Sequence, residues 1–461
     1  MREIDARTIA SGLPDLVLME NAAHRVVELL ERVFPSLSTQ RIVVFAGKGN
    51  NGGDGLAIAR ILWTRFAPLA LDVIIPGDAH PQLALLRASG FTAIHHAVPT
   101  HARAATIVID ALLGTGLTGP AREPYAAAIA EINSGFPVAK IVAVDLPSGM
   151  NADTGLAAGA VVRAHYSVTF TAPKLAHLLG HGLGQITVSP IGTPAAMLDE
   201  IRLSENEPSL WRHFFAPRPV EGHKGSFGHV LCIGGAVGKT GAIAMTGLAA
   251  LRMGAGLVTV ATSAASLPSP ELMTAPLSGD WNALTGDSIA IGPGLGPDPR
   301  VPAFVAQCPA PMVVDADALN SLVGAMPKAF AAPRVFTPHP GEMARVLGRP
   351  VADRLADAQQ FAATQGVIVV LKGHRTVIAH PDGRTALNPT GSPAMATAGS
   401  GDILTGLLAA LLARSDAWTA TLAAVYLHGL CGELAAAELT ESCVIATDLL
   451  CFLPEAIRRS A

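Results

Sequence analysis

The chain has 461 residues, half of them hydrophobic and only 15% charged, with a formal net charge of −4 at pH 7. Because single hydrophobic cores stop growing near roughly 250–300 residues, this length predicts two domains. The small net charge, with no basic run, argues against nucleic-acid binding, and five cysteines without a CxxC pair favour reduced thiols over disulfide bridges or a zinc site. The most apolar region, residues 405–430, is interrupted by Arg414 and Asp416, so we expect no membrane span. The first seven residues lead into no apolar segment, so we expect no secretory signal and a cytoplasmic location.

In the first half, apolar β-branched runs alternate with helical stretches, which is typical of a parallel α/β sheet. The predicted strands are residues 41–46, 71–75, 106–110, 141–145 and 166–170. A stretch marked by glycine and proline, residues 180–194, and a polar segment, residues 199–208, end this pattern. We therefore expect the domain boundary near residues 200–220.

The strand at residues 41–46 leads into the glycine-rich run Gly47–Gly55, and a helix is predicted over residues 56–66. Glycines before a helix let backbone amides approach an anion, although a plain tight turn is equally common. Asn50, Asn51 and Asp54 add amide and carboxylate oxygens to this run. Such oxygens suit a hard cation or ribose hydroxyl groups, so the run is a candidate binding loop.

Two further aspartates follow apolar strands and open glycine-bearing loops: Asp110 precedes residues 111–120, and Asp145 precedes residues 146–149. A single aspartate at a strand end is more often a helix cap or a turn residue. The carboxyl ends of parallel strands share one edge of a sheet, however, so three such loops predict one common crevice.

The ordered motifs of the first half resemble the NAD(P)H-hydrate epimerase family, the YjeF N-terminal domain, over residues 1–205. The motifs that carry this resemblance are residues 19–23, 50–55, 110 with 114–120, 145–149 and 171–174. It implies a Rossmann-like parallel-sheet domain in which Asp145 acts as acid or base. The vertebrate branch has a lysine in the loop after Asp110, and this chain has none between residues 114 and 120.

The same resemblance implies two sets of binding residues. The implied potassium ligands are Asn51, Asp110 and Ser148. The implied contacts with the hydrate are Asn50, Asn51, Gly52, Gly53, Asp54, Gly114, Thr115, Gly116, Leu117, Thr118, Gly119, Pro120 and Asp145.

In the second half the alternation of strands and helices resumes. The predicted strands are residues 229–234, 257–261, 288–292, 312–315, 335–337, 367–372 and 376–379, and the predicted helices are residues 240–253, 353–365, 402–413 and 418–438. We find no internal repeat, so two unlike α/β domains are expected rather than a duplication. Gly238-Lys239-Thr240 superficially resembles a P-loop, but Ile233 occupies the position of the required upstream glycine, which excludes a Walker A motif.

The run Ala398–Asp402 frees three successive backbone amides immediately before an apolar helix. This arrangement predicts an anion hole for a phosphoryl group, with Asp402 beside it to deprotonate an attacking hydroxyl. Taken alone, the run would more often make Asp402 a first-turn residue that complements the helix dipole. A surface lysine at a strand end is the default interpretation of Lys372, but its position between an apolar strand and Gly373 favours contact with a phosphate.

The second half resembles the NAD(P)H-hydrate dehydratase family, of ribokinase-like α/β fold, over residues 215–461. The motifs that carry this resemblance are, in order, HKGSFG, TGA, GPGLG, VVDADALN, THPGE, LKGHRT, NPTG and ATAGSGD. The implied hydrate contacts are Ala242, Gly296, His339 and Asp402. The implied adenine-nucleotide contacts are Lys372, Gly373, His374, Arg375, Thr376 and Gly401. ADP is the implied co-substrate, with a magnesium ion that Glu342 helps to place through water.

Together the resemblances imply a repair enzyme for hydrated NADH and NADPH. The first domain would epimerise the R and S hydrates, and the second would dehydrate the S hydrate while ADP becomes AMP and phosphate. Phosphorylation, with Asp402 as base, would turn a poor leaving group into a good one. The expected partners are NADHX, NADPHX and ADP, and a homo-oligomer is expected. The alternatives are a ribokinase-like vitamin-precursor kinase and a non-catalytic nucleotide- or RNA-binding scaffold in the first half.

Overall fold

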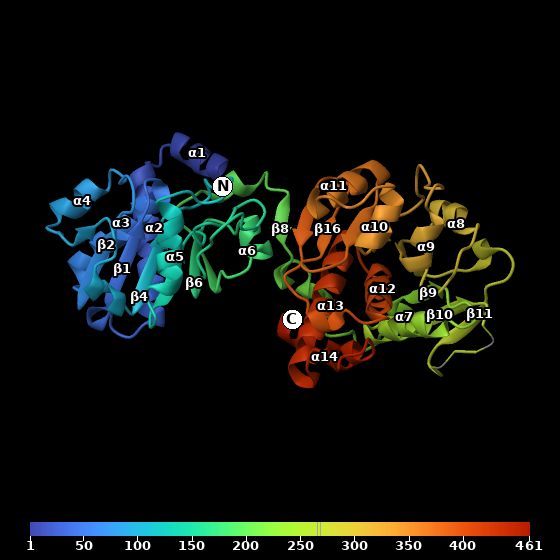
Figure 1. The fold of residues 1–461 in the computed structure, drawn as a ribbon. Coiled ribbons are helices and arrows are strands. Elements are labelled where there is room, and N and C mark those ends of the chain that lie inside the picture. Colours follow the sequence, from blue (N-terminus) through green and yellow to red (C-terminus); the bar gives the residue numbers. More distant parts are fainter. Residues whose placement is uncertain (265, 268) are drawn as a thin grey trace. The chain divides into compact units, whose positions relative to one another are not determined.

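A computed structural model describes residues 1–264, 266–267 and 269–461 of the chain. The chain divides into two compact units, Met1–Ile201 and Arg202–Ala461, each of which contains one β-sheet with helices (Figure 1). The predicted pair of unlike α/β domains is therefore confirmed.

The first unit is built on a seven-stranded sheet of order β3-β2-β1-β4-β5-β6-β7, in which every recorded pair is parallel. Its strands are β1 (Arg41–Ala46), β2 (Ala70–Ile74), β3 (Ile94–His95), β4 (Ile107–Ala111), β5 (Lys140–Val144), β6 (Tyr166–Phe170) and β7 (Gln185–Ser189). The five predicted strands correspond to β1, β2, β4, β5 and β6. The sequence prediction missed β3, which has two residues, and β7, which lies inside the glycine- and proline-marked stretch at residues 180–194.

Both faces of this sheet are buried, which explains the nearly continuous apolar strands. In β1, Ile42 and Val44 belong to the core that α2 and α3 cover, whereas Val43 and Phe45 belong to the core that α5 covers. The helices of the unit are α1 (Arg2–Ala10), α2 (Asp15–Val33), α3 (Asn50–Ile61), α4 (Leu83–Ala88), α5 (Tyr125–Ser134) and α6 (Leu175–Leu179), with short helical turns at Leu37–Thr39, Leu62–Phe66, Thr100–Ala104 and Ala195–Leu198.

The glycine-rich run after β1 is helical, not a loop. We predicted a helix from residue 56, but α3 begins at Asn50. A Cβ atom on Gly52 would overlap the carbonyl oxygen of Gly47, and one on Gly53 would lie 2.6 Å from Cε of Met19. The glycines therefore serve mainly to let the first turns of α3 pack closely, which a reading of glycine as a turn former does not reveal.

The second unit contains a ten-stranded sheet of order β11-β10-β9-β12-β13-β14-β15-β16-β17-β8. Pairs β15–β16 and β16–β17 are antiparallel, and the other recorded pairs are parallel. Its strands are β8 (Leu203–Glu205), β9 (His229–Ile233), β10 (Leu257–Thr262), β11 (Met273–Pro276), β12 (Ser288–Ile291), β13 (Met312–Val314), β14 (Arg334–Phe336), β15 (Ile368–Leu371), β16 (Val377–Ala379) and β17 (Thr385–Leu387). Its helices are α7 (Thr240–Arg252), α8 (Val301–Gln307), α9 (Ala316–Ser321), α10 (Pro340–Leu347), α11 (Arg354–Gln365), α12 (Ser400–Leu412), α13 (Ala417–Leu439) and α14 (Asp448–Ser460).

The units divide after Ile201, within the range of residues 200–220 expected for the boundary, but residues placed at the end of the first domain belong to the second unit. Strand β8, which we assigned to the end of the first domain, pairs with β17 in the second sheet. Next to it, the buried Asn206 donates hydrogen bonds to Oδ1 of Asn388 and to the carbonyl oxygen of Leu422, and the Trp211 side chain is fully buried. Residues 203–214 thus belong to the second unit, because pairing with distant residues decides their position and their own polar sequence does not.

The most apolar segment forms two helices, as the charged residues within it predict. Helix α12 ends at Leu412, and Asp416 caps α13 by accepting a hydrogen bond from the amide of Thr419. Helix α13 is long and apolar enough to cross a membrane by length and composition, with a mean hydropathy of 1.3, but 67% of that window is buried inside the protein. It packs against α12 and α14 in the core of the second unit.

Candidate active sites

The first candidate site lies at the topological switch point of the first sheet. The strand order reverses between β1 and β4, and open α/β sheets bind ligands outside the carboxyl ends of the strands at such a point. The segments after these two strands are in close contact: the amide of Gly47 donates to the carbonyl oxygen of Ala111 at 3.0 Å, and any side chain on Gly47 would overlap the backbone of Leu112.

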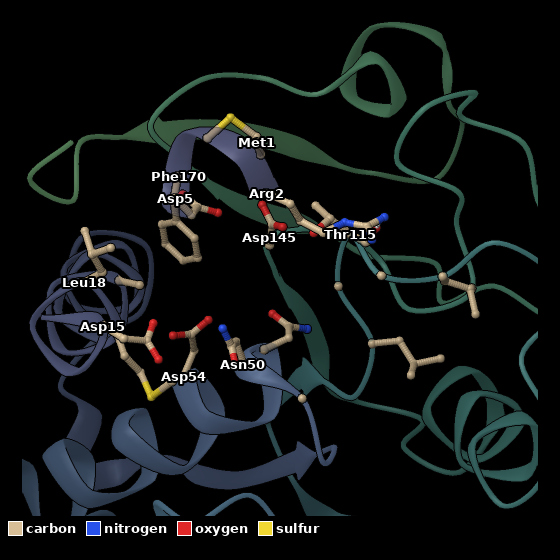
Figure 2. Close-up of a pocket in the computed structure, with 18 of the residues that line it drawn as sticks. Met1, Arg2, Asp5, Asp15, Leu18, Asn50, Asp54, Thr115, Asp145 and Phe170 are labelled. Atoms are coloured by element: carbon tan, nitrogen blue, oxygen red, sulfur yellow. Dashed lines mark hydrogen bonds between the residues drawn. The ribbon is translucent and has the colours of Figure 1, made fainter. Parts of the chain in front are cut away.

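A cavity of about 460 Å³ occupies this position (Figure 2). The predicted hydrate contacts that line it are Asn50, Asn51, Asp54, Gly114, Thr115, Gly116, Leu117 and Asp145. Among the described residues, its lining does not include Gly52, Gly53, Thr118, Gly119 or Pro120. The predicted loops therefore do converge, but two of the glycines pack within α3 and the end of the third loop lies outside the cavity wall.

Asp145 is paired with a lysine to which the sequence prediction gave no role. Lys174 Nζ lies 2.6 Å from Oδ1 of Asp145 and also donates to Oγ1 of Thr169 at 2.7 Å. Both charged side chains are largely buried, with 13% of Asp145 and 8% of Lys174 exposed. Asp145 has a φ of 65°, and His177 Nε2 donates to its carbonyl oxygen at 2.8 Å, which stabilises this unfavourable backbone conformation.

The cavity collects carboxyl groups from elements that are distant in the sequence. Figure 2 shows Asp5 of α1 and Asp145 on one side, with Asp15 of α2 and Asp54 of α3 on the opposite side. Burial, followed by the charges of Asp145 and Asp15, raises the pKa of Asp54 well above its ordinary value. Burial also raises the pKa of Asp5, which Lys174 opposes. Burial therefore favours the neutral form of Asp54 on one wall, whereas Asp145 on the other wall forms an ion pair with Lys174.

Two of the predicted cation ligands, Asp110 and Ser148, contact each other, and the third, Asn51, lines the cavity. Asp110 is fully buried and accepts hydrogen bonds from the amide and the hydroxyl of Ser148, at 2.8 and 2.6 Å. Burial raises the pKa of Asp110 to about 6, and the Ser148 hydrogen bonds oppose this rise. Within the described chain, the buried Oδ1 and Nδ2 atoms of Asn51 have no hydrogen-bond partner, and Gly114 lies against this side chain. An orphaned amide beside buried oxygens fits a weakly hydrated cation.

The second candidate site lies at the switch point of the other sheet, between β9 and β12. The amide of Ala236 donates to the carbonyl oxygen of Gly294 at 2.7 Å, which joins the two loops. Ala242 lies in the first turn of α7 beside Gly294, and the amide of Gly296 donates to Oδ2 of Asp317 at 2.8 Å. Two of the predicted hydrate contacts are thus brought to one edge of the sheet.

The predicted anion hole is the first turn of α12. Helix α12 begins at Ser400, two residues earlier than predicted, after Gly399 with a φ of 91°. A Cβ atom on Gly401 would lie 3.3 Å from Nζ of Lys372 and 3.8 Å from Oδ2 of Asp315. His428 of α13 donates from Nε2 to the carbonyl oxygen of Ser400 at 2.9 Å, and this hydrogen bond fixes the turn.

Lys372 forms a buried ion pair and is not a surface lysine. Its Nζ atom lies 2.8 Å from Oδ1 of Asp315, whose side chain is 2% exposed, and 3.9 Å from Glu342. Thr405 of α12 donates to the other oxygen of Asp315 at 2.8 Å. Hydrogen bonds therefore hold the ammonium group directly beside the Gly401 turn.

Asp402 titrates near neutrality in this environment. Burial, followed by the charge of Asp315, raises its pKa to about 7, while Lys372 lowers it. Two more acidic residues, Asp317 and Glu342, raise this pKa further. A carboxyl group with such a pKa suits a general base at physiological pH.

The remaining predicted contacts surround this cluster. His339 caps α10 by accepting at Nδ1 from the amide of Gly341, and its own amide donates to Glu342. The segment after Lys372 turns between β15 and β16, with Arg375 at a φ of 52° donating to the carbonyl oxygen of Pro389. Arg354 holds the turn by donating to the carbonyl oxygen of His374, and Thr376 Oγ1 donates to that of Gly373.

Comparison with known proteins agrees with the family resemblance of both halves of the chain. A family profile described as NAD(P)H-hydrate dehydratase matches residues 230–455, and one described as YjeF-related protein N-terminus matches residues 15–176. The bifunctional NAD(P)H-hydrate repair enzyme Nnr of Moorella thermoacetica is 40% identical over 97% of this chain and 93% of its own length. The chain belongs to this family. The Escherichia coli Nnr protein is 36% identical over 95% of this chain and 88% of its own length.

Two solved structures are similar to a little over half of the repair enzyme. The ADP/ATP-dependent NAD(P)H-hydrate dehydratase of Bacillus subtilis, co-crystallised with ATP and Mg²⁺, is 34% identical with a TM-score of 0.51 over 57% of this chain and all of that one. A ribokinase-like superfamily protein of Enterococcus faecalis is 32% identical with a TM-score of 0.51 over 56% of this chain and 96% of that one. These structures confirm the predicted ribokinase-like fold.

The sequence prediction left out several residues of the repair enzyme that face the two sites. Lys174 and Asp315 belong to motifs that carry the family resemblance. Nothing in the neighbouring sequence, however, indicates which distant residue each of them contacts. Asp5 and Asp15 precede the first predicted strand, so the rule that ligands bind at the carboxyl ends of strands does not point to them. A signal was present for Asp15, which lies just before the predicted motif at residues 19–23.

Proposed function

We propose that the first unit interconverts the R and S hydrates of NADH and NADPH at the Asp145 cavity, and that the second unit dehydrates the S hydrate while ADP becomes AMP and phosphate. This proposal refines the repair function of the family, which joins an NAD(P)H-hydrate epimerase to an ADP/ATP-dependent dehydratase. The observation that carries it is Asp402, with a pKa of about 7, at the amino end of α12 beside the Lys372–Asp315 pair. Cytoplasmic location and a homo-oligomeric state stay predictions.

In the dehydration, Asp402 accepts the proton of the hydrate's hydroxyl while the hydroxyl oxygen attacks the terminal phosphoryl group of ADP. AMP leaves, and the amides of residues 399–401 together with the Lys372 ammonium stabilise the transferred phosphoryl group. The lone pair of the ring nitrogen then expels phosphate from the neighbouring carbon. Loss of a proton from the adjacent ring carbon restores the dihydropyridine, so one hydrate and ADP give NADH, AMP and phosphate.

Magnesium fits the second site, because the carboxylates of Asp317, Glu342 and Asp402 provide the oxygen donors that this ion prefers. Bound with the nucleotide, the ion would neutralise phosphate charge, and Glu342 would hold it through water. The protein itself contributes the base, the amides and the buried ammonium group described above.

In the epimerisation, the inverted carbon bears the hydroxyl and adjoins the ring nitrogen. Asp54 is positioned to donate a proton to the departing hydroxyl, because its pKa is raised, and Asp145 takes a proton from the water that adds to the opposite face. Their positions on opposite sides of the cavity suit an inversion (Figure 2). Two carboxyl groups in different environments are a common basis for paired acid and base roles.

Potassium would be held by Asn51, Asp110 and Ser148, whose buried oxygens carry one carboxylate charge at most. Its positive charge would compensate Asp110 and bring the segments after β1, β4 and β5 together. The unpartnered Asn51 amide supports this assignment.

The test is incubation of the full chain with a mixture of both hydrates and ADP, with NADH absorbance and nucleotide products followed together. We expect complete conversion to NADH with equal amounts of AMP and phosphate. In Asp402→Asn, dehydration falls by about 10²–10⁴-fold while epimerisation continues. Asp382→Asn, at an exposed aspartate between β16 and β17, serves as the matched control. A stable phosphorylated product without NADH would instead indicate the vitamin-precursor kinase alternative, and full dehydration by a folded Asp402→Asn protein would exclude Asp402 as the base.

A further inference from the structure

We propose that the edge of the first sheet binds a transition-metal ion, Zn²⁺ or a divalent ion of similar ligand preference, through Asp72, His95 and His101. These residues come from three elements: β2, β3 and the helical turn Thr100–Ala104. Their candidate ligand atoms all lie within 4.8 Å of one another. The cluster is separate from the residues to which we assign epimerisation and dehydration.

The cluster has the geometry of three ligands around one centre. Nε2 of His95 and Nε2 of His101 lie 2.9 and 3.1 Å from the same oxygen, Oδ1 of Asp72. The two imidazole rings do not stack but meet at 72°, with their centroids 6.2 Å apart. Ligand atoms in a tetrahedral site with bonds of about 2.0–2.1 Å lie roughly 3.3 Å apart, so small side-chain movements would admit an ion.

The donor set selects the class of ion. Two imidazole nitrogens and one carboxylate oxygen suit Zn²⁺, Co²⁺, Ni²⁺ or Cu²⁺, whereas Mg²⁺ and Ca²⁺ prefer oxygen ligands throughout. Each imidazole can bind the ion through its Nε2 atom when the ring proton is on Nδ1. Asp72 would supply a buried negative charge, because its side chain is only 5% exposed.

The site is open to solvent on one side. The His101 side chain is 65% exposed and that of His95 is 31% exposed, so an ion can enter and water can complete its coordination. Strand β3 has two residues and lies at the edge of the sheet, where it pairs with β2. An ion held by all three elements would therefore fasten this edge and the turn at residues 100–104 to β2.

Simple hydrogen bonding is the competing explanation, since a buried carboxylate can accept from two histidines without any ion. The two explanations differ in what added metal does. If the cluster only forms hydrogen bonds, added metal should bind it no more tightly than it binds the other histidines of the chain. If the cluster is a metal site, the protein should bind one equivalent of metal tightly, and substitution of a ligand residue should abolish this binding.

The experiment uses the full chain without a polyhistidine tag, stripped with a chelator and dialysed. Co²⁺ is titrated while its visible absorption is recorded, and Zn²⁺ binding is measured by calorimetry. We expect one equivalent bound by the wild type, with Zn²⁺ raising the melting temperature. The exposed His101→Ala variant should lose at least about tenfold in affinity for both ions and should lose the rise in melting temperature.

His96→Ala is the matched control, because it removes the neighbouring histidine, whose Nδ1 lies against the carbonyl oxygen of Ile75 and not in the cluster. It should bind both ions like the wild type, and His95→Ala should lose affinity like His101→Ala. Circular dichroism verifies that each variant is folded. Equal affinities of the wild type and a folded His101→Ala, or an equal loss in His96→Ala, would overturn the proposal.

Discussion

At the scale of single residues, the two proposed reactions depend on aspartates whose neighbours give them different properties. Asp145 forms a short ion pair with Lys174. Asp402 lies near Lys372, but that lysine is already paired with Asp315, and burial dominates the Asp402 pKa. The same residue type thus forms an ion pair in one site and is poised to titrate in the other.

The pKa of Asp402 predicts the pH dependence of dehydration. Because the base acts in its ionised form, kcat/KM should fall as the pH drops through about 7. Asp315→Asn removes a negative charge that raises this pKa, so the acid limb of the profile should move to lower pH. Thr405→Val removes the hydrogen bond to Asp315 without changing a charge and is the control. An acid limb that stays in place in Asp315→Asn, measured by initial rates on either side of pH 7, would contradict this electrostatic account.

Asp145→Ala should stop enzymatic epimerisation and spare dehydration of the S hydrate. The loss of a positioned acid–base group costs about 10²–10⁴-fold in rate. The measurement is the time course of a mixed hydrate with ADP, in which the variant should consume the S form rapidly and the R form only at the spontaneous rate. Asp153→Ala, at an exposed aspartate of the following loop, is the control. Complete consumption at the wild-type rate would remove Asp145 from the reaction.

Asp110→Ala should abolish the response of epimerisation to potassium. The buried Asp110 carboxylate supplies the negative charge of the proposed cation site, and without it the Asn51 and Ser148 oxygens offer too little attraction. Rates are compared across potassium concentrations at constant ionic strength, with a bulky organic cation as replacement. If Asp110 only organises its loop through Ser148, the variant will be less stable but will keep the wild-type potassium response.

At the scale of elements, the contact between α7 and α12 positions the second site. Helix α12 carries Asp402, α7 carries Ala242, and the two helices make the most extensive helix–helix contact in the described chain. Gly406 makes this approach possible, because a Cβ atom there would overlap the carbonyl oxygen of Thr246 and lie 2.7 Å from Cβ of Ala249. The close packing thus depends on the missing side chain.

Gly406→Ala should therefore destabilise the second unit by about 1–3 kcal/mol through overpacking and should slow dehydration by moving α12. Gly241→Ala, a helical glycine of α7 with open space around its Cβ position, should be neutral or stabilising by up to about 1 kcal/mol. Urea denaturation and dehydration rates of both variants make the comparison. Equal stabilities would show that the helices can separate without cost.

At the scale of the whole molecule, the chain joins two units that each bury their own core. The fused arrangement suits the proposed chemistry, because a fixed Asp402 accepts only one configuration of the hydroxyl carbon. The other hydrate would accumulate without an epimerase made in equal amount. Fusion of the two units guarantees that equality.

The boundary between the units can be tested with fragments. A fragment of residues 202–461 should fold and dehydrate the S hydrate, whereas one of residues 215–461 should be several kcal/mol less stable. The shorter fragment lacks β8, the hydrogen bonds of Asn206 and the fully buried Trp211, whose removal alone costs about 3–5 kcal/mol. Urea midpoints and dehydration rates of the two fragments decide the matter; equal midpoints would return the boundary to residue 215.

The sequence by itself determined most of the strands, several of the helices and the order of the binding loops, but it did not reveal short edge strands such as β3 or the long helix α2. Runs such as residues 41–46 and 368–371 are mostly apolar because both faces of their sheets are covered. The residue types of each run therefore indicate its burial without any knowledge of the fold. Charged residues such as Asp416 likewise mark helix starts through local hydrogen bonds. The motifs at strand ends then follow, because parallel strands place their carboxyl ends at one edge.

Only the tertiary structure decided which side chains meet. Lys174 reaches Asp145 across 29 positions, Lys372 reaches Asp315 across 57, and Asn206 reaches Asn388 across 182. Residue periodicity reports whether a position is buried, but it carries no information about which distant group shares that burial. The pKa values of Asp54 and Asp402 depend on the same packing, since desolvation and neighbouring charge exist only after the chain has folded.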